Sequence, residues 1–227
     1  MAVRRSLVSD QVFRILCEDL LSGRYAPGEL LPTQRRLAAD LGVNMASVRE
    51  AIKRLEQLRL VESRQGEGMR VRDWRAHGGL DVLAHLVLRA GRIDAGVLAA
   101  VMEARRLMLA EAARLAAERR TDEQAARLAG LADTLAGTAD PGERQALDFA
   151  FYAELVEAAR NIVFVLILNS IREAYFAHAE RFRGLTADRA RLDPLYAEVA
   201  RAVAEREPEA AAKATRALAT AQEEAVL

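Results

Sequence analysis

The stretch Glu29–Val71, ELLPTQRRLAADLGVNMASVREAIKRLEQLRLVESRQGEGMRV, contains the signals that decide the fold of the first part of this chain. Thr33 can cap a short helix that Gly42 ends, and Asn44 can cap a second helix directly afterwards. Two short helices joined by a tight glycine-containing turn are typical of a helix-turn-helix. The stretch therefore predicts a helix pair of the kind that places its second helix against DNA.

The second of these helices is amphipathic. Val48, Ile52 and Leu55 recur at i, i+4 and i+7, so they form an apolar stripe that faces inward. Arg49 and Lys53 then point away from that stripe. We expect the polar beginning of this helix to be exposed.

A glycine-studded segment follows the helix pair. LRLVESRQGEGMRVRDW alternates apolar and polar residues around the glycines at 66 and 68, which predicts two strands joined by a flexible tip. Upstream, apolar residues at helical spacing predict a first helix over about residues 8 to 22, capped by Ser9 and followed by Gly23. Three helices and a hairpin in this order predict a winged helix-turn-helix.

The predicted DNA-binding residues follow from the geometry of such a domain. An α-helix fits the major groove, and arginines and the first residues of the helix reach base edges and phosphates. Gly66 would let the hairpin backbone enter a minor groove, where a side chain would clash. The candidate DNA-binding residues are Arg35, Asn44, Met45, Ala46, Ser47, Arg49, Gln65 and Gly66. Further arginines can equally be phosphate contacts or solvated surface charges, namely Arg36, Arg64, Arg70 and Arg72.

Length and composition limit the class of protein. The 227 residues are 52% hydrophobic and 29% charged, enough for a packed core and for two domains. Cys17 is the only cysteine, which fits a reducing compartment. The longest apolar run, residues 162–168, is too short to cross a bilayer, and no signal core is present at the N-terminus. We expect a soluble, cytoplasmic protein without a membrane partner.

Charge and composition change along the chain. Residues 1–75 contain 14 Lys and Arg against 10 Asp and Glu, whereas the remainder contains 19 against 23. A basic first part joined to an acidic second part suggests that only the first meets a polyanion. The segment 71–81 is the expected linker, so the predicted domains are a DNA-binding domain over 1–75 and an all-helical domain over 76–227.

The second part is rich in Ala, Leu, Arg and Glu, which favour helices. Six or seven helices are expected, at about 79–90, 94–119, 122–136, 142–159, 161–183, 188–205 and 208–225. A helical bundle holds ligands between facing helices, through inward polar side chains. The candidate effector-binding residues are Arg105, Asp148, Tyr152, Asn169, Tyr175 and Tyr196, each of which can instead be a surface residue or a satisfied core residue.

Other classes of protein fit the sequence less well. One cysteine, three scattered histidines and the lack of a nucleophile motif or glycine phosphate loop speak against an enzyme. A protein that only compacts DNA would not need a bundle large enough for a ligand. Such a protein would bind DNA without sequence preference and with a steep dependence on salt.

The segment GELLPTQRRLAADLGVNMASVREAIKRLEQLRLVESRQGEGMRV resembles the winged-helix domain of the GntR family of bacterial transcription factors. The resemblance covers about residues 8 to 73 and implies that Arg35 and Arg49 contact bases and that Gly66 enters the minor groove. The family commonly has an arginine directly after the residue that caps the third helix, where this chain has Met45. Since methionine cannot make a bidentate contact with guanine, we expect a different base pair there.

The rest of the chain resembles the FadR-type regulators within that family, which respond to fatty acids. DWRAHGGLDVLAHL, VMEARRLML, LDFAFYAELVEAARN and LILNSIREAY carry this resemblance, which fades after about residue 180. It implies a long-chain acyl-CoA effector and control of genes for fatty acid metabolism, as a repressor or an activator. We expect a homodimer on a palindromic operator. The alternatives are a GntR-type regulator of a small carboxylic acid or sugar acid, and a DNA-binding protein without a ligand.

Many relatives with this helical domain bind a divalent metal through one aspartate and three histidines. Here Asp148 is present, but the matching histidine positions hold Tyr152, Tyr196 and Leu218. A metal needs several converging ligands with lone pairs, so we predict no metal and no other cofactor. Arg105 would then pair with a phosphate or carboxylate of the effector.

Overall fold

The computed structural model describes residues 2–89 and 92–227, which form two compact units, Met1–Asp94 and Ala95–Leu227. The first unit is therefore longer than the domain predicted from the sequence, which ends at residue 75. The ring of His85 packs edge-on against that of Phe13, with centroids 5.3 Å apart, which explains why the segment after residue 75 belongs to the first unit.

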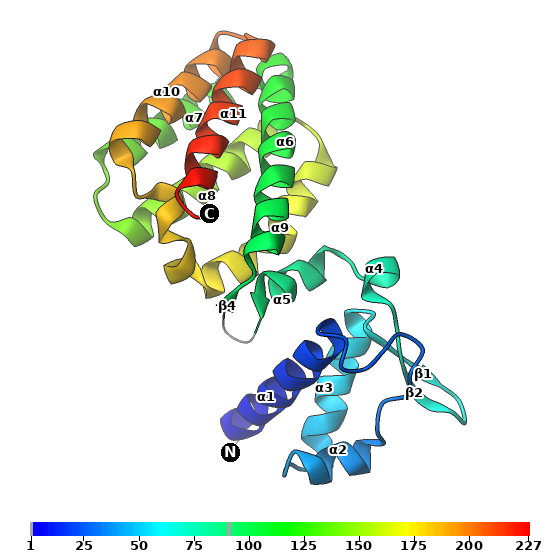
Figure 1. Cartoon of the computed structure of the whole chain (residues 1–227). Coiled ribbons are helices and arrows are strands. Elements are labelled where there is room, and N and C mark those ends of the chain that lie inside the picture. Colours follow the sequence, from blue (N-terminus) through cyan, green and yellow to red (C-terminus); the bar gives the residue numbers. More distant parts are fainter. Residues whose placement is uncertain (1, 90–91) are drawn as a thin grey trace. The chain divides into compact units, whose positions relative to one another are not determined.

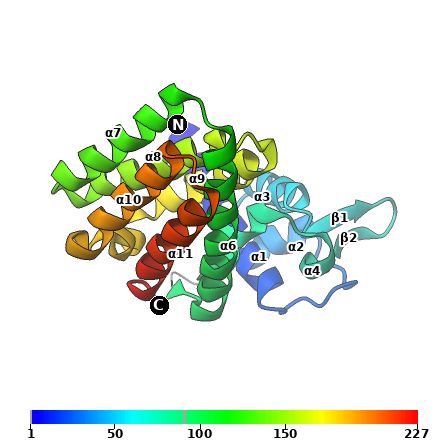
Figure 2. The same cartoon turned by 90° about the horizontal axis from the view of Figure 1, so that it is seen from above.

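The first unit is built around helices α1, α2 and α3, and a β-hairpin projects from them (Figures 1 and 2). Its main elements are α1 (Ala2–Leu21), α2 (Gln34–Asp40), α3 (Met45–Gln57), β1 (Val61–Arg64) and β2 (Gly68–Val71). After the hairpin come α4 (Trp74–His77), a 3₁₀ turn η1 (Leu80–Val82), α5 (Leu83–Val87), β3 (Leu88–Arg89) and β4 (Arg92–Ile93).

The core of this unit lies between α1 and α3. The predicted stripe of Val48, Ile52 and Leu55 is at most 2% exposed, and it packs against α1. Phe13 and Leu16 of α1, each 2% exposed, complete this contact. The helical spacing in the sequence thus predicted the buried faces of both helices correctly.

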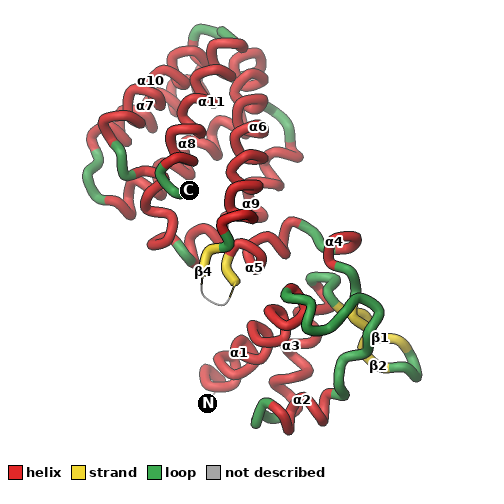
Figure 3. Tube along the Cα trace, in the orientation of Figure 1, coloured by secondary structure: helices red, strands yellow, loops and turns green. Residues whose placement is uncertain are grey.

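The second unit is made almost entirely of helices (Figure 3). Its elements are α6 (Ala95–Arg119), α7 (Asp122–Gly137), α8 (Pro141–Ala158), α9 (Ile162–Ala177), η2 (Ala179–Thr186), α10 (Arg189–Ala204) and α11 (Pro208–Glu224). The last helix packs against both α6 and α10, and α8 packs against α6 and α7. Polar side chains of α6, α8, α10 and α11 can therefore meet inside the unit. A mainly helical chain with an N-terminal winged helix-turn-helix was the predicted fold class.

Three element predictions were wrong. The first helix begins at Ala2, so Ser9 lies inside it and is 7% exposed instead of capping it. In place of the helix expected over 79–90, residues 80–89 are divided between η1, α5 and β3, because Leu88 is extended and pairs with Ile93. Residue 90 lies outside the described residues. The helix expected over 161–183 ends at Ala177, and the chain continues as η2 after His178.

In the described residues, no single helix is long and apolar enough to cross a membrane. Only the pair of α9 and η2, bent by 110°, meets the requirements of length and composition together.

Candidate nucleic-acid interface and ligand site

The turn between α2 and α3 has the geometry that its cap residues predicted. The hydroxyl of Thr33 accepts a hydrogen bond from the Arg36 backbone N–H at 3.3 Å, and Asn44 Oδ1 accepts one from the Ser47 N–H at 2.9 Å. Gly42 has a φ of +63°, a left-handed conformation that favours glycine. These local interactions fix the direction in which α3 leaves the turn.

Two of the predicted base-reading side chains are engaged within the domain. The Asn44 side-chain oxygen is occupied as the cap of α3, and Ser47 is only 4% exposed. A buried hydroxyl cannot reach a base edge without rearrangement of the helix. The exposed start of α3 is therefore formed by Met45 and Ala46, followed one turn later by Arg49.

Ion pairs separate the arginines of this domain into two groups. Among residues 2–89 and 92–227, the exposed Arg35 and Arg49 form no ion pair. The other arginines considered in the sequence all pair with carboxylates: Arg36 with Asp40 at 2.9 Å, Arg64 with Glu62 at 2.9 Å, Arg70 with Glu67 at 2.7 Å and Arg72 with Glu62 at 3.8 Å. Arg35 and Arg49 thus have uncompensated charge that a phosphate or guanine can accept.

The hairpin has a short tip with two glycines in conformations that other residues rarely adopt. Strands β1 and β2 pair from Val61–Val71 to Arg64–Gly68, and the tip leaves Gln65 exposed. Gly66 has a φ of +81° and Gly68 a φ of +107°. Because a Cβ at Gly66 would meet no protein atom within 4 Å, the backbone conformation alone demands glycine there.

A polar network lies at the centre of the second unit. Asp148 Oδ1 accepts hydrogen bonds from the Tyr196 hydroxyl at 2.5 Å and from Gln222 Nε2 at 2.8 Å. Gln222 Oε1 in turn accepts bonds from the Tyr152 hydroxyl and from Arg105 Nη2, both at 2.8 Å. The Arg105 guanidinium also lies over the Tyr152 ring, 4.6 Å from its centroid. We call these five residues the central network.

The central network joins four of the six predicted effector residues through a residue that sequence reasoning missed. Gln222 is fully buried on α11, one turn after Leu218, which is also fully buried. Residues at i and i+4 lie on the same face of a helix. The spacing of Gln222 from the apolar Leu218 could therefore have predicted that Gln222 points inward.

Burial dominates the electrostatics of the network. It raises the pKa of Asp148, although Arg105 and the hydrogen bonds from Tyr196 and Gln222 oppose the shift. Burial also raises the pKa of the Tyr152 and Tyr196 hydroxyls. For Arg105, burial alone would lower the pKa, but Tyr152 and Asp148 raise it overall. The guanidinium therefore stays charged.

The residues of the central network do not fit a divalent metal. Asp148 supplies the only carboxylate, and the Arg105 guanidinium places a positive charge where a second cation would be repelled. Within the described part of the chain, no group of three or more His, Cys, Asp or Glu side chains is arranged to hold a metal. A protein cation thus lies beside the aspartate.

The two other predicted effector residues lie outside the central network. Tyr175 is partly buried, and its hydroxyl is 3.4 Å from Gln145 Nε2. Gln145, 1% exposed, also donates to the Ala179 carbonyl at 2.9 Å. Asn169 was expected to point inward, but it is exposed, because Leu168 takes the buried position of α9.

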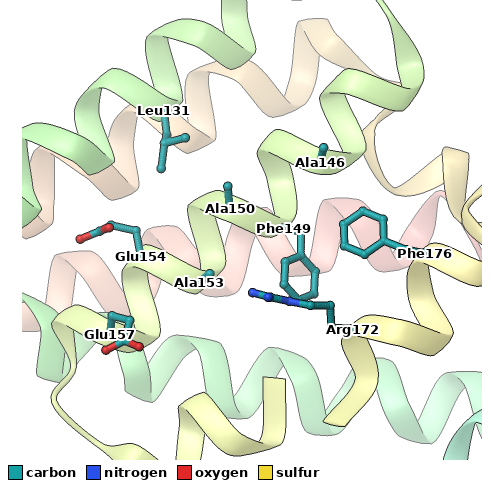
Figure 4. A pocket seen from close by; sticks show the side chains of 9 residues that line it. All are labelled: Leu131, Ala146, Phe149, Ala150, Ala153, Glu154, Glu157, Arg172 and Phe176. Atoms are coloured by element: carbon teal, nitrogen blue, oxygen red, sulfur yellow. The ribbon is translucent and has the colours of Figure 1, made fainter. Parts of the chain in front are cut away.

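A cavity of about 470 Å³ that is wide open to solvent lies along the side of α8 opposite the central network (Figure 4). Alanines of α8 at positions 146, 150 and 153 line it together with Phe149, Phe176, Leu131, Arg172, Glu154 and Glu157. The Arg172 guanidinium lies 5.0 Å from the centroid of the Phe149 ring. This cavity combines apolar lining with one cation and two carboxylates, of which Glu154 is paired with Arg127. None of the six predicted effector residues lines it.

Comparisons with known proteins match both units. The family described as "Bacterial regulatory proteins, gntR family" matches residues 8–71, and the family described as "FCD domain" matches residues 100–221. The first match contains α2, α3 and the hairpin. The second match contains four of the five residues of the central network, and Gln222 lies just beyond its end.

Proteins with similar sequences include named transcriptional regulators. The HTH-type transcriptional regulator Mce2R of Mycobacterium tuberculosis is 38% identical over 94% of this chain and 89% of its own length. A fatty acid metabolism regulator protein of Edwardsiella ictaluri is 27% identical over 70% of this chain and 66% of its own length. The solved structure of the Listeria monocytogenes protein Lar, 19% identical, superposes with a TM-score of 0.58 over 96% of this chain and 95% of that one.

Proposed function

Because the chain belongs to the GntR family and contains an FCD domain, it is a DNA-binding transcriptional regulator with a ligand-binding domain, and we propose that its ligand is a long-chain acyl-CoA. In this proposal the protein is a FadR-type repressor of genes for fatty acid metabolism. The observation that carries the proposal is the cavity along α8.

The apolar side chains and the arginine of that lining suit an apolar chain with an acidic group, whereas the carboxylate of Glu157 would repel the acidic group. Phe149, Phe176 and Leu131 offer apolar surface, and burial of each CH₂ group of an acyl chain contributes about 0.8 kcal/mol. Arg172 supplies a cation for a phosphate or carboxylate. The name of the Edwardsiella relative supports the same class of ligand.

A homodimer is the proposed assembly, with one α3 on each half of a palindromic operator. Large apolar side chains exposed on α9 support self-association of the second unit. Ile162, Val163 and Leu166 are 66%, 55% and 60% exposed, and contiguous exposed apolar surface of this kind is typical of interfaces. Ligand binding then changes operator affinity by favouring one conformation of the dimer.

The central network favours a second candidate ligand, a small carboxylate or sugar acid. Arg105 is a partly buried cation whose hydrogen-bond acceptor, Gln222 Oε1, is neutral. A carboxylate that replaced this amide oxygen would gain a charge-assisted bond with the guanidinium. The two candidates use different arginines, so substitutions can distinguish them.

Calorimetry with palmitoyl-CoA, free coenzyme A and a four-carbon dicarboxylate tests the proposal. We expect palmitoyl-CoA to bind and to lower or raise operator affinity, with binding weakened by Phe176→Asp and by Arg172→Ala. Lys213→Ala, which changes an exposed side chain of α11, is the control. Binding of the dicarboxylate alone, lost in Arg105→Met, would replace the first candidate with the second. Sequence-specific DNA binding that none of these ligands changes would count against both.

A further inference from the structure

The exposed start of α3 presents an apolar surface one turn before the unpaired Arg49. Met45 is 40% exposed and Ala46 is exposed, whereas the oxygen of the preceding Asn44 is used as a helix cap and the following Ser47 is buried. Asn44 Oδ1 is bonded to the Ser47 N–H, and Ser47 is 4% exposed. The side chains that α3 offers first to a partner are therefore a thioether and a methyl group.

The exposure of Met45 is unusual, because few large apolar side chains of the first unit are exposed. Of the described residues of α2, α3, β1 and β2, Met45 is the only large apolar one that is exposed. Arg49 lies one turn further on the same side of α3, because residues at i and i+4 are neighbours on a helix. Met45 thus belongs to the surface that includes the unpaired Arg49.

The major groove of DNA contains one apolar group that such a surface can recognise. Thymine has a C5-methyl group there, and the other groups at base edges are hydrogen-bond donors and acceptors. A thioether is flexible and polarizable, so it adapts to a methyl group without strict geometry. An apolar side chain placed against cytosine N4 or adenine N6 would leave those groups without a partner.

We propose that Met45, supported by Ala46, makes this protein select thymine in each operator half-site through contact with the C5-methyl group, while Arg49 contacts a guanine nearby. This inference rests on the DNA-binding function of the first unit. It assigns to Met45 a positive role in specificity, in addition to the absence of a guanine contact that the sequence predicts.

The test begins with selection of binding sites by the full-length protein from a pool of random duplexes. Each thymine of the selected half-site is then replaced singly by uracil, which differs only in lacking the methyl group. We expect one or two positions at which uracil lowers affinity about fourfold, the factor that corresponds to one buried methyl group at about 0.8 kcal/mol. Uracil at the other positions serves as the internal control.

Substitutions at residue 45 complete the test. Met45→Ala should bind thymine and uracil duplexes equally at the sensitive position, and its helix should be intact because alanine favours helices. Met45→Arg should change the selected base there from thymine to guanine. Equal affinity of the wild-type protein for every uracil duplex, or uracil sensitivity that persists in Met45→Ala, would overturn the inference. Failure to select any sequence would instead count against the assigned DNA-binding surface as a whole.

Discussion

Gln222 on α11 donates a hydrogen bond of 2.8 Å to Asp148 on α8, across 74 residues of sequence. Its amide oxygen accepts from Tyr152 and Arg105, so one side chain satisfies polar groups of two other helices, α8 and α6. The interior of the second unit is thus held by hydrogen bonds as well as by apolar packing.

Gln222→Leu should destabilise the second unit, because the Tyr152 hydroxyl and the Arg105 guanidinium lose their common acceptor. A buried polar group left without a partner costs about 1–3 kcal/mol. Urea denaturation followed by circular dichroism measures the change in the free energy of unfolding. Gln65→Leu, at the exposed tip of the hairpin, should leave that free energy unchanged. Equal stability of the two variants would contradict the importance of the network.

Asp148→Asn should change how stability depends on pH. Burial raises the pKa of Asp148 above its ordinary value of 3.8, so the folded chain binds this proton more tightly than the unfolded chain does. The resulting stabilisation is complete below the ordinary pKa and is lost as pH rises through the pKa of the folded state. The free energy of unfolding of the wild type, relative to Asp148→Asn, should therefore fall as pH rises above 3.8.

Comparison of the two proteins at each pH removes the effect of all other titrating groups. Asparagine keeps an oxygen acceptor for Tyr196 and Gln222, so the fold should be retained. A difference that is independent of pH, or that grows in favour of the wild type as pH rises, would contradict the assigned direction.

Arg144→Met should cause a large loss of stability. This side chain is 2% exposed and donates to the carbonyl oxygens of Leu135, Thr138 and Thr186 and to Asp193 Oδ1, the last at 2.6 Å. Removal of one partner of a buried ion pair costs about 3–5 kcal/mol. Thermal and urea unfolding measure the loss of stability. The ion pairs of Arg114 lie on the surface, so Arg114→Met should change stability little.

Arg49→Ala should weaken binding to the selected operator more than Arg36→Ala. Loss of a bidentate arginine–guanine contact costs about 1–3 kcal/mol, whereas Arg36 is already paired with Asp40. Fluorescence anisotropy at one fixed salt concentration compares the two variants. Equal effects, or unchanged affinity of Arg49→Ala, would argue that α3 does not read the operator through Arg49.

Leu166→Glu should convert the proposed dimer into a monomer, because it places a charge in the exposed apolar surface of α9. Sedimentation equilibrium of the DNA-free protein measures the mass. Leu107→Glu is the matched control, since Leu107 is also exposed, at 56%, but lies on α6. A dimer that persists in Leu166→Glu and dissociates in Leu107→Glu would place the interface on α6.

The sequence alone determined the features that depend on neighbours along the chain. Caps at Thr33 and Asn44 and the apolar stripe of α3 predicted the helix-turn-helix, because a cap bonds to a backbone group three residues away and a stripe repeats every three or four residues. For the same reason α6, α7, α8, α10 and α11 were predicted within a few residues of their ends. The break at His178 was missed, since the sequence there continues with good helix formers.

Only the tertiary structure decided which side chains are available. Arg72 and Arg49 look alike in sequence, but the fold of the hairpin brings Glu62 to within 3.8 Å of Arg72. Ser47 and Met45 are two residues apart on the same helix, yet packing of α3 buries the serine and leaves the methionine outside. Gln222 bonds to Asp148 because α11 packs against α6, and α6 also packs against α8. These helices are far apart in sequence, so no local pattern could have predicted the hydrogen bond.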